Sequence, residues 1–149
     1  MIKSALLVAS AALLAACGHA IATSSMSESQ LAPADAFQCV MKEFETLGYQ
    51  RTSYDKDALR TTARKVNPKI TFSNVQFRKT WDLLEAQAQA GAAGTDLKVT
   101  ASTAAEYFGQ TGPVLNTIET SPEAKEAAAT LQRTCSSRAT APAAAAPQQ

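Results

Sequence analysis

Apolar side chains recur every third or fourth position near both ends of the chain, which is the spacing of one face of an α-helix. The first such stretch covers residues 33–47, and the second begins at Thr120 or Ser121 and ends at Cys135. A proline opens the first stretch and a glycine follows it, as is common at helix ends. The pattern therefore predicts two helices. Their apolar positions are Phe37, Val40, Met41, Phe44 and Leu47 in the first, and Ala124, Ala127, Ala128, Leu131 and Cys135 in the second.

Between these helices, apolar and polar residues alternate, which is the spacing of a strand with one buried face. Four strands are predicted, over residues 49–55, 58–66, 76–90 and 97–103. The second half of the third strand is also rich in good helix formers, but its period of two and the glycine that follows favour a strand. Residues 70–75 fit either a loop or a strand extension. Residues 109–116 contain two glycines and a proline and predict a loop.

The order of these elements predicts an α+β fold, α-β-β-β-β-α. We expect a two-layer sandwich, in which an N-terminal and a C-terminal helix pack on one face of a four-stranded antiparallel meander. The chain has 149 residues, enough for one such domain, which we place at residues 33–135. Residues 136–149 are rich in Ala, Pro and Gln and predict a disordered tail.

The N-terminus has a different pattern, in which Lys3 precedes an apolar run over residues 5–14. The run is too short for the roughly 20 residues that span a bilayer. It ends in Leu14-Ala15-Ala16-Cys17, which resembles the lipobox of bacterial lipoproteins: an aliphatic residue, two small residues and a cysteine that receives lipid. The alternative is a plain secretory signal followed by an incidental cysteine.

This resemblance implies that residues 1–16 are a signal peptide and that Cys17 carries diacylglyceryl and acyl chains such as palmitate. It also implies attachment to the cell envelope. Gly18 stands where an aspartate would favour retention in the inner membrane, so we expect the periplasmic side of the outer membrane. Residues 17–32 would then be a lipidated N-terminus and a flexible tether. A helix with a cysteine, the step Leu47-Gly48-Tyr49 and a late helix ending in cysteine also resemble small envelope lipoproteins.

Two further cysteines, Cys39 and Cys135, remain if Cys17 carries lipid. An even number of cysteines in an oxidising compartment predicts a disulfide between them. Two helices side by side on one sheet can bring such residues within the roughly 4.4–6.8 Å between Cα atoms that a disulfide requires. Two buried free thiols and a disulfide to another chain are the alternatives.

Charged residues are unevenly distributed, although the formal net charge is only +1. Basic residues dominate positions 51–79, and acidic residues dominate positions 80–126. Arg60 and Arg64 share strand parity and, with Lys65, predict a patch for an anionic envelope partner such as lipopolysaccharide, peptidoglycan or an acidic envelope protein. The other interpretation is a solvated sheet face whose basic side chains pair with acidic neighbours.

Residues typical of enzyme active sites are scarce, and we expect no enzyme. The single histidine, His19, lies in the predicted tether, and the sequence has no Cys-x-x-Cys pair, no metal-binding cluster of His and Cys and no glycine-rich phosphate loop. We therefore expect no cofactor and no metal. A net charge near zero argues against nucleic acid as a partner. The sequence thus predicts a lipid-anchored binding or scaffolding protein, with a structural lipoprotein without a ligand, or an unrecognised enzyme, as alternatives.

Overall fold

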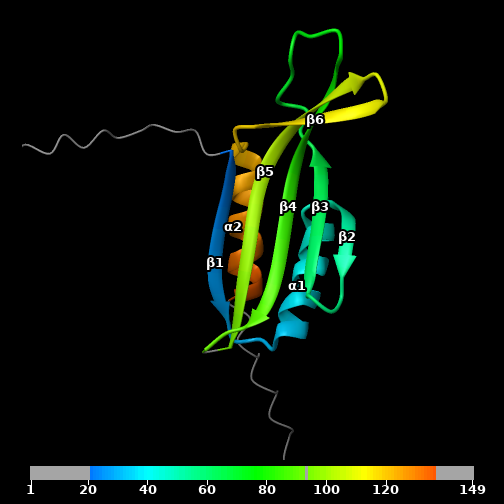
Figure 1. The fold of residues 1–149 in the computed structure, drawn as a ribbon. Helices are drawn as coiled ribbons and strands as arrows, with labels where there is room; N and C mark the ends of the chain where they lie inside the picture. The colour runs from blue at the N-terminus through cyan, green and yellow to red at the C-terminus, as the bar shows by residue number, and fades with distance from the viewer. Residues whose placement is uncertain (1–20, 93, 137–149) are drawn as a thin grey trace, which may run out of the picture.

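The computed structural model describes residues 21–92 and 94–136, which form a six-stranded antiparallel sheet with two helices packed on one face (Figure 1). The α+β class, the antiparallel sheet and the two helices agree with the prediction, whereas the sheet has six strands and not four. The elements in chain order are β1 (Ala22–Ser29), α1 (Pro33–Thr46), β2 (Gln50–Asp55), β3 (Arg60–Val66), β4 (Phe77–Ala90), β5 (Thr95–Gly109), β6 (Gly112–Ile118) and α2 (Pro122–Ser136).

The strands β2, β3, β4 and β5 form the predicted meander, in which each strand pairs antiparallel with the next. In the strand order β1-β5-β4-β3-β2, β5 is the second strand, and β6 also pairs with it. One of its edges bonds β4 along most of its length, whereas the other edge bonds β1 over residues 95–102 and β6 over residues 103–109. β1 and β6 therefore lie end to end along the same edge of β5.

β1 corrects the predicted tether, because residues 22–29 form a strand where we expected flexible chain. Its side chains toward α2 are serines, so the segment has no apolar alternation that would predict a strand. These serines bond to α2 instead: Ser25 Oγ donates to Gln132 Oε1 at 2.9 Å, and Ser29 Oγ donates to the carbonyl oxygen of Cys135 at 2.8 Å. The predicted order placed the first helix at the N-terminus of the domain. This is wrong, because β1 precedes α1.

The hairpin of β5 and β6 corrects the predicted loop at residues 109–116. Gly109 and Gly112 face each other where the hairpin turns, and Gly112 has a φ of 140°, a conformation that favours glycine. Pro113 follows at the start of β6, a position that a proline tolerates because the strand is at an edge. The glycines and the proline therefore mark the turn between two strands and not an extended loop.

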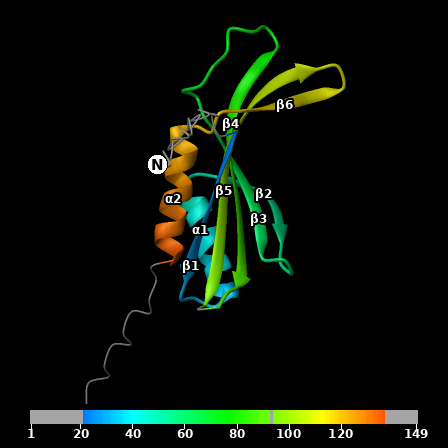
Figure 2. The ribbon, with the colours of Figure 1, turned by 60° about the vertical axis from the view of Figure 1, so that its left-hand side comes forward.

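The core lies between the sheet and the helices (Figure 2). Every second residue of β4 faces the helices, and its small side chains there, Ala86 and Ala88, let the helices approach closely. Cys39 of α1 and Cys135 of α2 form a disulfide with 5.7 Å between their Cα atoms, which confirms the predicted pairing. The largest fully buried apolar side chains are Phe44, Leu84, Leu97 and Leu131.

Several sequence predictions lie outside the described residues. They are the signal peptide over residues 1–16, the lipidated Cys17, and residues 137–149 of the predicted tail. Ser136, which we placed in the tail, is the last residue of α2. Among the described residues, neither helix has the length and apolar character needed to cross a membrane.

Candidate functional site

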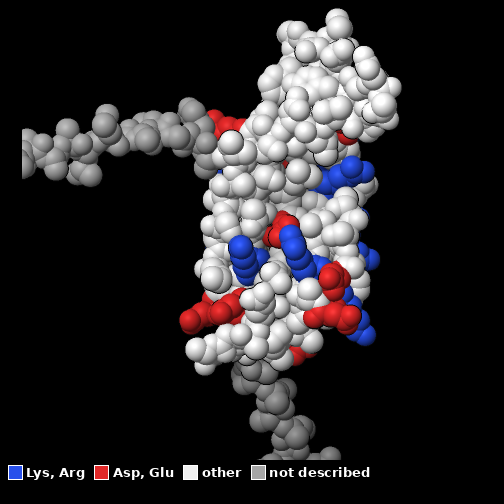
Figure 3. All heavy atoms as spheres, in the orientation of Figure 1, with Lys and Arg blue, Asp and Glu red and all other residues white. Residues whose placement is uncertain are grey.

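The sheet face that the helices leave uncovered is the face seen in Figure 3, and it displays charged side chains of both signs. Arg60 lies on this face, and its Nη2 is 2.9 Å from Oε1 of Glu85 on the neighbouring strand. The hydrogen bond to Glu85 raises the pKa of Arg60. Arg60 therefore belongs to a paired, solvated surface, which is the second interpretation that the sequence left open.

Arg64 lies on the same face in a different environment. Its guanidinium carbon is 4.3 Å from the centroid of the Trp81 ring, and Lys79 Nζ is 4.8 Å from the same centroid. Cations beside an indole ring are held by the negative potential of its face. Arg64 Nε is buried without a hydrogen-bond partner. We call Arg64, Lys79 and Trp81 the Trp81 cluster.

Glu106 of β5 fixes the orientation of the indole in this cluster. Trp81 Nε1 donates to Glu106 Oε2 at 2.7 Å, and Arg78 Nη1 lies 2.9 Å from Glu106 Oε1. Glu106 is thus engaged by both neighbours and is itself buried. Within the described part of the chain, neither Arg64 nor Lys79 forms an ion pair with a carboxylate. The Trp81 cluster therefore presents two cations that are not ion-paired within residues 21–92 and 94–136.

Lys65 does not join this surface. Successive residues of a strand point to opposite faces, and Lys65 extends toward the helices, where its Nζ donates to the carbonyl oxygen of Leu47 at 2.8 Å. Leu47 is the C-cap of α1, so the lysine charge lies where the helix dipole favours a cation. The predicted patch of Arg60, Arg64 and Lys65 is therefore not one surface. Arg64 is instead joined by two residues of β4.

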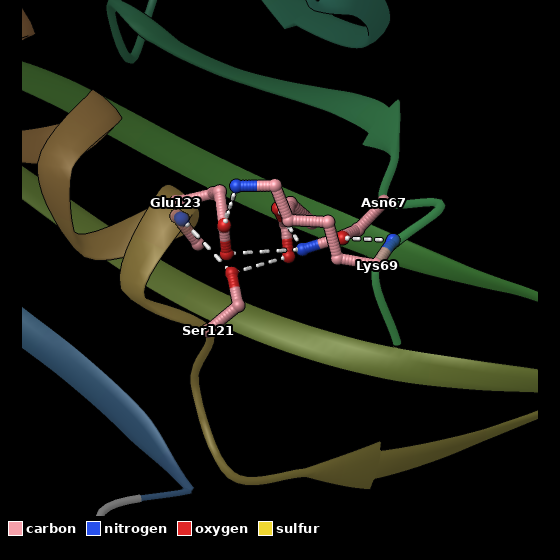
Figure 4. Close-up of polar contacts among 6 residues, drawn as sticks. Asn67, Lys69, Ser121 and Glu123 are labelled. Atoms are coloured by element: carbon pink, nitrogen blue, oxygen red, sulfur yellow. Dashed lines mark hydrogen bonds and ion pairs between the residues drawn. The ribbon is translucent and has the colours of Figure 1, made fainter. Parts of the chain in front are cut away.

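A groove of about 560 Å³ lies on the helix side of the sheet, between the end of α1 and the start of α2. Asp82 of β4 lines it and is buried. Its carboxylate accepts hydrogen bonds from Asn67 Nδ2 at 2.9 Å and from the hydroxyls of Thr103 and Ser121 at 2.9 and 2.7 Å. The Ser121 hydroxyl also accepts from the backbone N–H of Ala124 at 2.9 Å and so caps α2 (Figure 4). Asp82 thus holds the first turn of α2 against the sheet.

Two of the charged residues that line this groove form an ion pair. Lys69 Nζ lies 2.6 Å from Glu123 Oε1, and this contact lowers the pKa of Glu123 and raises that of Lys69 (Figure 4). Burial, with smaller contributions from Asp82 and Glu123, raises the pKa of Tyr49 far above its usual value, so its phenol stays neutral. These bonds make the groove a structural junction between the chain before β4 and α2. Among residues 21–92 and 94–136, no group of His, Cys, Asp and Glu could hold a metal ion.

The sequence analysis missed most of the Trp81 cluster. Lys79 and Trp81 are two residues apart on one strand, so their spacing alone places them on one face. Their meeting with Arg64 depends on the register of β3 and β4, in which Arg64 lies opposite Leu83. Glu106 carried a weaker signal, as a single acid within an otherwise uncharged stretch of β5.

Comparison with known proteins assigns no family to this chain. No protein-family model matches it, and no curated protein is significantly similar to it. A fold alone does not determine a function, so the functional argument rests on the surfaces described above.

Proposed function

We propose that this chain is a non-enzymatic lipoprotein of the cell envelope, anchored through Cys17, that binds an anionic partner with the Trp81 cluster. The lipobox-like Leu14-Ala15-Ala16-Cys17 supports the anchor and the periplasmic side of the outer membrane. The observation that carries the binding site is the position of Arg64 and Lys79 beside Trp81 without an acidic partner in the described structure.

The chemistry of the cluster suits a phosphate or a carboxylate. A guanidinium offers paired N–H donors that match either anion, and a lysine adds a point charge. Arg64 is half-buried, and its Nε has no acceptor among the described residues. Partial burial strengthens the attraction between these cations and an anion, because less water screens the charges. Lipopolysaccharide phosphates, peptidoglycan carboxylates and acidic envelope proteins all offer such groups.

Two matched substitutions test this proposal, because Arg64 and Arg60 share a strand, a face and a charge. We expect Arg64→Gln to weaken binding of the full chain to purified lipopolysaccharide or to peptidoglycan fragments about tenfold or more, as the loss of a charge-assisted hydrogen bond predicts. Arg60→Gln should leave binding unchanged, since Glu85 already pairs with Arg60. The measurement is a titration followed by thermophoresis at low and at physiological salt, where screening should weaken wild-type binding.

Equal losses in both variants would indicate general attraction of the anion to a basic surface and would contradict a specific site. If neither Arg64→Gln nor salt changes the binding of either probe, the Trp81 cluster is not an anion site. That result would favour a structural lipoprotein without an anionic ligand. Unfolding curves of both variants serve as the control for folding.

A further inference from the structure

One end of the molecule is built from two uncharged segments that lie far apart in the sequence. Residues 70–77 and residues 107–118 contain no Asp, Glu, Lys or Arg. The rings of Phe72, Phe77 and Tyr107 pack together with centroids 5.4 to 6.4 Å apart, and the backbone N–H of Phe108 donates to the carbonyl oxygen of Gln76 at 2.7 Å. We call these two segments the apolar end. In Figure 3 it is the uncharged upper part of the molecule.

Large apolar side chains are exposed at this end. Val75 is 99% exposed, Phe108 60% and Leu115 51%, and Phe72 and Val114 are exposed beside them. The hairpin of β5 and β6 projects beyond both helices, so neither helix covers these side chains (Figures 1 and 2). Single exposed apolar residues are ordinary, but a group of them on one projecting end is typical of a surface that contacts a partner or a membrane.

The chain enters the domain at the same end. Ala22 pairs with Ser102, directly before the part of β5 that pairs with β6. Cys17 precedes Ile21 by only four residues. Because a chain extends at most about 3.3–3.6 Å per residue, a lipid on Cys17 lies within about 14 Å of Ile21. The strand β1 thus replaces the long tether that the sequence predicted, and it leaves only a short link to the lipid.

A cation lies at the border of the apolar end. Arg78 directly follows Phe77, and its guanidinium carbon is 4.8 Å from the centroid of the Phe108 ring. Proteins that lie in a membrane interface place apolar side chains among the acyl chains and keep Arg or Lys at the level of the phosphates. The order of apolar tip and adjacent cation fits a lipid surface.

We propose that the apolar end contacts the bilayer to which Cys17 anchors the chain, with Val75, Phe108 and Leu115 in the interface and Arg78, which stays paired with Glu106, at the level of the lipid headgroups. This inference rests on the lipid anchor of the proposed function. The short link keeps the apolar end close to the membrane, so even a weak contact is populated, as for any tethered second binding step. The domain then stands on its uncharged end, with the turn between β2 and β3 pointing away from the lipid.

Fluorescent labels on single cysteines test this orientation in the full chain. The wild-type chain should offer no thiol to an environment-sensitive NBD label, since Cys39 and Cys135 are bonded and Cys17 would carry lipid. The variants are Val75→Cys and Leu115→Cys at the apolar end, with Asp57→Cys in the exposed turn at the opposite end as the matched control. Each labelled variant is reconstituted into vesicles of phosphatidylethanolamine and phosphatidylglycerol.

We expect the labels at positions 75 and 115 to emit at shorter wavelength in vesicles and to be protected from dithionite added outside. The label at position 57 should be reduced at the rate of free dye. Equal reduction at all three positions would overturn the proposal. Protection that vanishes when the protein is diluted in the same lipid would assign the apolar end to a second copy of the chain. The wild-type chain is tested for labelling before any vesicle is made. A label on Cys17 would overturn the lipid anchor and, with it, this orientation.

Discussion

The two halves of β5 place one strand in two different environments. Residues 95–102 lie between β1 and β4 and beneath the helices, and their inward side chains Leu97, Val99 and Ala101 are fully buried. Beyond residue 106, β5 continues into the hairpin with β6, where Phe108 is exposed. Both halves contain apolar residues. The covering helices, more than the strand pattern, decide which of these residues are buried.

The two halves of β5 also differ in what holds them in place. The covered half combines apolar burial, the Asp82 junction and the disulfide, whereas the hairpin is held by its backbone ladder and by the rings of Phe72, Phe77 and Tyr107. Regions with few buried apolar contacts open at lower free energy than the core. We therefore expect substitutions in the covered half to change the free energy of unfolding, and substitutions in the hairpin to leave it nearly unchanged.

The largest effect should come from the disulfide. Replacing Cys39 and Cys135 together by alanine opens a loop whose ends are 96 residues apart. The chain-entropy model gives about 4.7 kcal/mol for a loop of roughly this length, and measured losses are about 2–5 kcal/mol. Urea unfolding of the wild-type chain and the double variant measures the loss. Wild-type protein treated with a reductant is the control, and a midpoint that neither treatment lowers would contradict this prediction.

A matched pair of leucines on strands of the same sheet gives the sharpest contrast. Leu97 is fully buried, whereas Leu115 is 51% exposed. We expect Leu97→Ala to lower the free energy of unfolding by about 2–5 kcal/mol, because it leaves a cavity under the helices. Leu115→Ala should change it by no more than about 0.5 kcal/mol. Denaturant unfolding of both variants decides the matter, and losses of similar size would mean that the hairpin is part of the cooperative core.

A smaller loss than that of Leu97→Ala is expected at the cap of α2. Ser121→Ala removes the hydroxyl that bonds both Asp82 and the backbone of Ala124. Loss of a helix cap and of one bond to a buried carboxylate predicts about 1–2 kcal/mol. This corresponds to a fall of several degrees in the thermal midpoint. Ser73→Ala, in the exposed segment before β4, is the control. If it lowers the thermal midpoint as much as Ser121→Ala does, the bonds of Ser121 do not stabilise α2.

The fold was predictable where burial depends on apolar side chains. Helical spacing located α1 and α2, and alternation located the meander, including Ala86 and Ala88 of β4. β1 was not predictable in this way, because Ser25 and Ser29 reach α2 through hydroxyl bonds and not through apolar contact. β6 was hidden for another reason, since the glycines and the proline of a hairpin turn have the same composition as a loop.

The candidate site was predictable only in part. Strand parity correctly placed Arg60 and Arg64 on one face and, applied consistently, it also sends Lys65 to the other. The predicted patch was built from residues close together in the sequence. The residues that meet at Arg64 are instead determined by the register between β3 and β4. A shift of one residue between β3 and β4 would turn Trp81 away from Arg64, and no property of a single strand reveals that register.

The pairing of β1 with β5 also determines how the domain responds to a mechanical pull. A force applied to the chain before Ile21 acts along the axis of β1, while the backbone bonds to β5 lie across that axis. The load is then shared by the ladder from Ala22 to Ser29, and these bonds must shear together before the strand yields. A pull on the end of α2 would instead load the disulfide almost at once, because Cys135 directly precedes Ser136, the last residue of the helix. The ladder between β1 and β5 therefore resists a pull in the direction in which an N-terminal lipid would hold the domain.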